Sequence, residues 1–141
     1  MTSFAVLEPG EQLARRLVAR FGPAVEAERA PGLLVVAPGA QVRPGLRCGT
    51  VLLPGYESGL LENICARGAV SYGLSGRDTV TLSSREGQHM WVAVQRELVR
   101  LDGTVLEQQE IPVTVPDGIS EVQMLALTGA MLLLGAQPEE L

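Results

Sequence analysis

The sequence predicts a single α/β domain over residues 1–141, with a short parallel Rossmann-like layer, an antiparallel meander and a buried C-terminal helix. Three observations predict this fold class. Unbroken apolar runs separated by Pro-Gly turns fill residues 1–76, as expected for strands buried on both faces of a parallel sheet. Apolar and polar residues alternate over residues 77–116, which is typical of half-buried antiparallel strands. Residues 119–135 are apolar around most of the helical circumference, which indicates a buried helix.

The first predicted elements are a strand and an amphipathic helix. Phe4–Leu7 is a short apolar segment with the composition of a strand. Glu11–Phe21 carries apolar residues at helical spacing, and Gly22 provides the stop. The apolar residues of this helix are Leu13, Leu17, Val18 and Phe21.

Three continuous apolar runs predict the remaining parallel strands, at Leu33–Ala37, Thr50–Leu53 and Ala69–Tyr72. A helix over Ser58–Ala66 is expected to connect the last two of them and so complete a right-handed α/β layer. The residues of this helix expected to face inward are Leu60, Leu61 and Ile64.

The second half predicts a three-stranded meander. Thr79–Ser83 alternates, with Val80 and Leu82 on one face, and Glu86-Gly87 forms a turn into a strand over Met90–Val99. Asp102-Gly103 is a strong two-residue hairpin pattern leading into a strand over Thr104–Val115.

The closing helix is predicted over Ser120–Leu134, with Gly135 and then Pro138 as the stop. Its apolar residues leave little polar face, so we expect it to lie under the meander or at a subunit interface. These apolar residues are Met124, Leu125, Leu127, Met131, Leu132, Leu133 and Leu134.

The basic side chains exclude several kinds of chemistry, because all eleven are arginines. A Walker-type phosphate loop and Schiff-base catalysis both require a lysine. The net charge of −5 and the lack of a clustered basic surface argue against binding to nucleic acid. We therefore predict no nucleic-acid partner.

The sequence predicts no catalytic or metal-binding residue and no cofactor. Cys48 and Cys65 lie outside any thiol-protease pattern, and His89 is the only histidine, so zinc spacing is absent. The two cysteines make no disulfide framework, and the N-terminus lacks the pattern of a signal peptide. The longest apolar stretch is about half a membrane span, so we expect a cytoplasmic protein without a membrane partner.

Several segments resemble the later part of the central domain of the Mur ligases, the ATP-dependent amide ligases of bacterial peptidoglycan synthesis. Gly49–Leu53, a helix, and then Val70–Ser75 are similar to strands of that domain, which often carries a Thr-Tyr-Gly-Leu/Phe-Ser-like stretch. An antiparallel meander follows in both. Pro116–Gly118 and Leu125–Gly135 resemble the family's Pro-Gly-His-Asn turn and its alanine-rich helix. The resemblance spans residues 33–141 and implies a shared scaffold.

The departures from that family remove its chemistry. The chain has no phosphate-binding loop, no lysine for ATP and no modified lysine for magnesium, and Ile119–Glu121 replaces the His-Asn pair. The leading functional prediction is therefore a non-catalytic Mur-ligase-like module that acts by binding or assembly, with an unknown protein partner or with itself.

An alternative prediction is an enzymatic or ligand-binding α/β domain that takes a small anion at its strand-end loops, because ligands of open α/β sheets bind beyond the carboxyl ends of the strands. The residues predicted to form this site are Gly55, Tyr56, Ser58, Ser75 and Arg77. A third prediction is a structural homo-oligomer that associates through exposed strand edges and the apolar closing helix.

Overall fold

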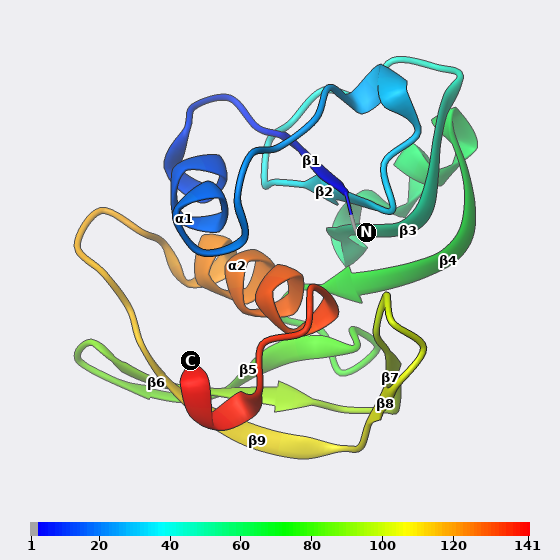
Figure 1. Cartoon of the computed structure of the whole chain (residues 1–141). Coiled ribbons are helices and arrows are strands. Elements are labelled where there is room, and N and C mark those ends of the chain that lie inside the picture. The colour runs from blue at the N-terminus through cyan, green and yellow to red at the C-terminus, as the bar shows by residue number, and fades with distance from the viewer. Residues whose placement is uncertain (1–2) are drawn as a thin grey trace.

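A seven-stranded mixed sheet runs through the computed structural model, which describes residues 3–141 apart from the side chain of Ser58. The mostly parallel sheet with an antiparallel part and a C-terminal helix confirms the predicted α/β fold class (Figure 1). In spatial order the strands are β1 (Phe4–Leu7), β2 (Leu33–Val36), β3 (Leu46–Pro54), β4 (Ile64–Tyr72), β5 (Val80–Glu86), β6 (His89–Val94) and β9 (Gln109–Thr114).

The first four strands are parallel and follow one another in chain order. All four residues of β2 are buried, as its unbroken apolar run predicts, because this strand lies between β1 and β3 with a hydrophobic core on each face. The predicted segment Thr50–Leu53 forms the second half of the longer strand β3.

Helix α1 (Gln12–Phe21) confirms the first predicted helix. Leu13 and Leu17 are fully buried in the core that α1 shares with the sheet. The Glu8 carboxylate, rather than the residue that directly precedes the helix, accepts hydrogen bonds from the backbone N–H groups of Leu13 (3.1 Å) and Ala14 (2.9 Å). Gly22 ends the helix with a φ of 90°, a conformation that favours glycine.

The prediction of a helix over Ser58–Ala66 is wrong. The segment forms a 3₁₀ helix, η2 (Gly55–Asn63), interrupted at Glu57, and β4 already begins at Ile64. Gly55 and Gly59 in η2 weaken a regular helix, and the β-branched Ile64 pairs with Leu46 in the sheet. The predicted strand Ala69–Tyr72 is the end of β4, but only its last residue is buried, so burial on both faces was also wrong.

The antiparallel part contains β5, β6 and β9, with the turn after Glu86 where it was predicted. The long predicted strands Met90–Val99 and Thr104–Val115 are each divided. Their inner ends form a separate hairpin of β7 (Leu98–Val99) and β8 (Val105–Leu106), which contains the predicted Asp102-Gly103 turn. A short 3₁₀ helix, η1 (Ala27–Arg29), lies between α1 and β2, and another, η3 (Pro138–Glu140), lies near the C-terminus.

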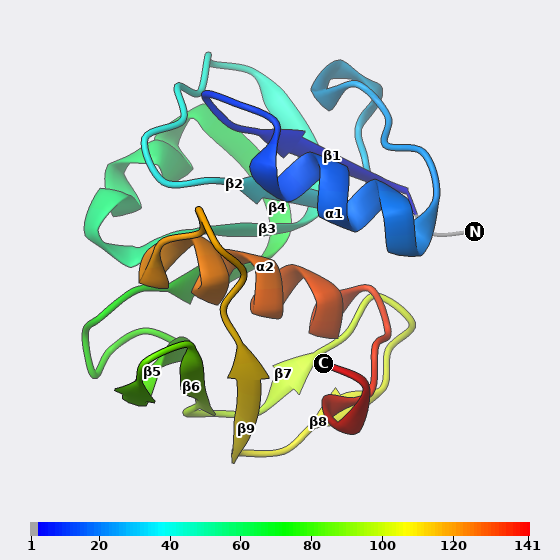
Figure 2. The same cartoon turned by 90° about the vertical axis from the view of Figure 1, so that its left-hand side faces the viewer.

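Helix α2 (Glu121–Leu133) confirms the predicted closing helix. Ser120 caps it, because its hydroxyl accepts the Gln123 N–H and the Gln123 side chain accepts the Ser120 N–H. α2 lies between α1 and the parallel strands on one side and the antiparallel strands on the other (Figure 2). The chain itself therefore buries the helix, as one of the two predicted arrangements requires. No helix within residues 3–141 combines the length and apolarity needed to cross a membrane.

Candidate functional site

The candidate site lies at the carboxyl ends of β3 and β4. Pro54 ends β3 and pairs with Tyr72, which ends β4, so the segments that follow the two strands leave the sheet at one edge. β4 and β5 are joined by the single pair Tyr72 and Val80, and residues 73–79 span the space between them as a loop. The strand order contains no reversal here, and the pairing changes from parallel to antiparallel one strand further on, between β5 and β6.

A pocket of about 400 Å³ opens at this edge, within the size range of small-molecule sites. Four of the five residues predicted for the anion site line it, although they come from two separate loops. The fifth, Ser58, belongs to η2, but its side chain lies outside the described residues. The lining residues are Gly55, Tyr56, Leu74, Ser75, Arg77, Asp78 and Val122.

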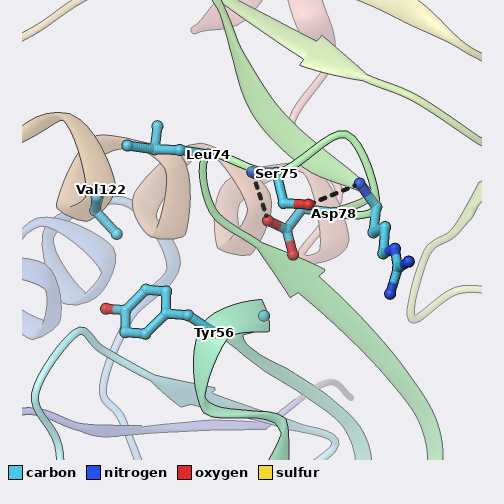
Figure 3. Close-up of a pocket in the computed structure, with 7 residues that line it drawn as sticks. Tyr56, Leu74, Ser75, Asp78 and Val122 are labelled. Carbon is cyan, nitrogen blue, oxygen red and sulfur yellow. Dashed lines mark hydrogen bonds between the residues drawn. The ribbon is translucent and has the colours of Figure 1, made fainter.

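Asp78 is the residue of this pocket that the sequence-based prediction missed. It is only 4% exposed, and its Oδ2 accepts a hydrogen bond of 3.1 Å from the Ser75 N–H (Figure 3). The Asp78 N–H in turn donates to the Ser75 carbonyl (3.0 Å), and the Ser75 Oγ accepts from the Arg77 N–H (3.1 Å). A serine followed three residues later by an aspartate in a glycine-containing segment is a turn pattern that would have drawn attention to Asp78.

Glycine at position 55 makes room for the Asp78 carboxylate. A Cβ atom at Gly55 would lie 1.8 Å from the Asp78 Oδ1 and 2.9 Å from its Cγ, both well inside van der Waals contact. The Asp78 carboxylate therefore lies directly against the backbone at Gly55, which is where the two loops contact each other.

Two side chains that follow β6 hold the loop of residues 73–79 in place by hydrogen bonds. The Gln95 amide donates to the carbonyls of Gly76 (3.1 Å) and Asp78 (2.6 Å). The Arg96 Nη1 donates to the Arg77 carbonyl (2.8 Å) and to the Thr79 Oγ1 (3.2 Å). Because these bonds hold the backbone on both sides of Asp78, the loop that carries Asp78 is preorganised for binding.

Part of the pocket wall is apolar. Tyr56 and Leu74 are 62% and 61% exposed, and Val122, in the first turn of α2, completes the wall (Figure 3). Burial of part of the ring and the negative charge of Glu57 raise the pKa of the Tyr56 hydroxyl, so this group is a neutral hydrogen-bonding partner at pH 7. An apolar wall beside a few polar groups is the usual composition of a small-molecule site.

Arg77 is the one basic residue among those that line the pocket. Its guanidinium has no carboxylate within ion-pair distance in the part of the chain that the structure describes. The first turn of α2 also borders the pocket, and a helix N-terminus favours negative charge. Asp78, which also lines the pocket, supplies a negative charge, so the pocket is mixed in sign.

The cysteines and the single histidine lie elsewhere. Cys48 is buried on β3, and its burial and the neighbouring Cys65 raise the pKa of its thiol to about 11, which is the opposite of an activated thiolate. His89 is exposed at the start of β6. Among residues 3–141 no three His, Cys, Asp or Glu side chains gather as a metal site would require.

Comparisons of the chain with protein-family models, with curated protein sequences and with solved structures give no match. The functional interpretation therefore depends on the geometry of the strand-end pocket.

Proposed function

We propose that this protein is a binding module for a small anionic ligand, which it takes in the pocket formed by Gly55, Tyr56, Ser75 and Arg77. The observation that carries the proposal is the convergence of two loops, separate in sequence, on one pocket that contains an arginine without a carboxylate partner among residues 3–141. An arginine donates several hydrogen bonds in a planar array that suits carboxylate and phosphate groups.

The proposed role is binding rather than catalysis. Histidine, lysine and cysteine are absent from the seven lining residues, so the Ser75 hydroxyl has no general base beside it except Asp78. The Asp78 carboxylate accepts the backbone N–H of Ser75, a bond that fixes the loop. Kinship with the Mur ligases stays a prediction, in which this pocket would be a binding site on a scaffold without ligase activity.

The proposal is tested by measuring thermal unfolding with inorganic phosphate, sulfate and simple carboxylates. A ligand present at about 100 times its dissociation constant stabilises the native state by about 2.7 kcal/mol. Arg77→Ala should abolish the stabilisation without unfolding the protein. Arg67→Ala is the matched control, because Arg67 is an exposed arginine on β4 that does not line the pocket. Equal stabilisation of the two variants would contradict the proposed site.

Self-association is a second candidate function, supported by one exposed apolar pair. Val99 and Val105 face each other across the β7–β8 hairpin and are 59% and 50% exposed. Light scattering of the protein and of the Val99→Thr/Val105→Thr variant tests it. A dimer that the double substitution dissociates would support self-association through the hairpin, whereas a monomeric wild type would exclude it.

A further inference from the structure

A second cavity, of about 450 Å³, adjoins the pocket on the other side of Asp78. Gly55, Arg77 and Asp78 line both cavities, so the two spaces meet at these three residues. The first cavity continues along the apolar wall of Tyr56, Leu74 and Val122. The second contains additional polar groups, those of Ser71, Thr79 and Arg96.

Arg96 brings a second guanidinium to the second cavity. Its Nη1 is used for the two hydrogen bonds that hold the loop, to the Arg77 carbonyl and the Thr79 Oγ1. Its Nε and Nη2 have no hydrogen-bond partner within the described residues. An arginine held in place through one nitrogen, with donors left over, is arranged to bind an anion by two parallel hydrogen bonds.

Asp78 places an acceptor in the same cavity as these donors. Of its two carboxylate oxygens, Oδ2 accepts the Ser75 N–H, and Oδ1 has no donor among the described atoms. The residue as a whole is only 4% exposed, but Oδ1 is not among the fully buried atoms that lack a partner, so this oxygen is accessible to a ligand. Arg77, Arg96 and Asp78 line the same cavity, so two cationic side chains and an acceptor border one space.

From this juxtaposition we infer that the two cavities hold one ligand, an apolar carboxylate with an O–H or N–H donor on the carbon next to the carboxylate. Arg77 and Arg96 bind the carboxylate, Asp78 accepts the donor, and the apolar body lies against Tyr56, Leu74 and Val122. This inference rests on the proposed function and adds the chemical class of the ligand.

The charges at the junction explain why the donor matters. A ligand with only a carboxylate meets two arginines but also the negative charge of Asp78. A hydroxyl or ammonium group on the neighbouring carbon converts the repulsion by Asp78 into a charge-assisted hydrogen bond. The site therefore distinguishes ligands through a group that a simple anion lacks.

Three probes that share one apolar body test the inference by isothermal titration calorimetry: 3-phenylpropionate, 3-phenyllactate and phenylalanine. The inference predicts that phenyllactate and phenylalanine each bind about tenfold more tightly than phenylpropionate, as a hydrogen bond to a charged group would provide. Asp78→Asn has nearly the same shape and should reduce this difference to less than about threefold while phenylpropionate binds no more weakly. Circular dichroism verifies that the variant is folded.

Arg96→Lys is a second variant, which keeps the charge but loses the paired donors, and it should weaken all three probes about equally. Equal affinities of phenylpropionate and phenyllactate for the wild type would overturn the inference, whether or not Asp78→Asn folds. If phenylpropionate binds and Arg77→Ala abolishes that binding, the proposed function stands even when this inference fails. If none of the probes or simple anions binds, both fail.

Discussion

Replacement of Gly55 by alanine tests how the two loops of the site are joined. The new Cβ would lie 1.8 Å from the Asp78 Oδ1, so the carboxylate must move away from its position. It cannot keep the 3.1 Å hydrogen bond from the Ser75 N–H when it moves. Loss of a hydrogen bond to a charged group costs about 1.5–3 kcal/mol, and an off-rotamer side chain adds about 0.5–1.5 kcal/mol. We therefore expect Gly55→Ala to lower the free energy of unfolding by about 2–4 kcal/mol.

The assay is urea denaturation followed by circular dichroism, with Gly76→Ala as the control. Gly76 belongs to the loop that carries Asp78 and does not have a left-handed backbone conformation, and a Cβ atom added there would meet no other atom within 4 Å. Its substitution should change the free energy of unfolding by less than about 1 kcal/mol.

A double-mutant cycle separates the clash with Asp78 from any other effect of the new methyl group. In an Asp78→Ala background the obstructing carboxylate is absent, so Gly55→Ala should cost less than about 1 kcal/mol, which gives a coupling of at least about 1 kcal/mol. If Gly55→Ala has the same cost in both backgrounds, the reasoning about the two loops is refuted.

Three further predictions concern the core, the cysteines and the closing helix. Tyr72→Phe removes the buried 2.6 Å hydrogen bond to the Val36 carbonyl and should cost about 1–3 kcal/mol in urea denaturation. Burial raises the pKa of Tyr72 above its ordinary value of 10.0, so the wild type should lose stability relative to the variant as the pH rises above 10; parallel pH profiles would contradict this. Mass spectrometry after brief alkylation at pH 8 should find Cys65 modified and Cys48 intact, since Cys65 is exposed and burial raises the Cys48 pKa to about 11; rapid double modification would speak against the described burial. Ser120→Ala removes the cap of α2 and should lower the free energy of unfolding by about 1 kcal/mol. An unchanged midpoint of urea denaturation would contradict this prediction.

Much of the fold follows from local patterns that tertiary contacts reinforce. The strand Phe4–Leu7 and the helices α1 and α2 agree with the sequence-based prediction because apolar spacing, caps and glycine stops all favour the same element. The structure of the connection between β3 and β4 could not be predicted from local patterns, because its leucines fit a helix and its glycines oppose one. There the pairing of Ile64 with Leu46, a contact between distant parts of the chain, determines the structure.

The candidate site was predictable only in part for a similar reason. Parallel strands end at a common edge, so the residues after Pro54 and Tyr72 could be placed together from the sequence. Asp78 could not be placed, because its position depends on the room that Gly55 leaves and on the loop contacts of Gln95 and Arg96. Val122 also reaches the pocket through the packing of α2 and not through its own sequence context.

The central claim is that ligands bind at the carboxyl ends of β3 and β4, and a two-dimensional ¹H–¹⁵N NMR titration tests it most directly. With 3-phenyllactate as the probe, we predict saturable shifts concentrated in the backbone amides of Gly55–Glu57, Gly73–Thr79 and the first turn of α2. The same titration of Arg77→Ala should show little change. Saturable shifts elsewhere on the sheet, or none at any concentration of phenyllactate or phosphate, would contradict the account.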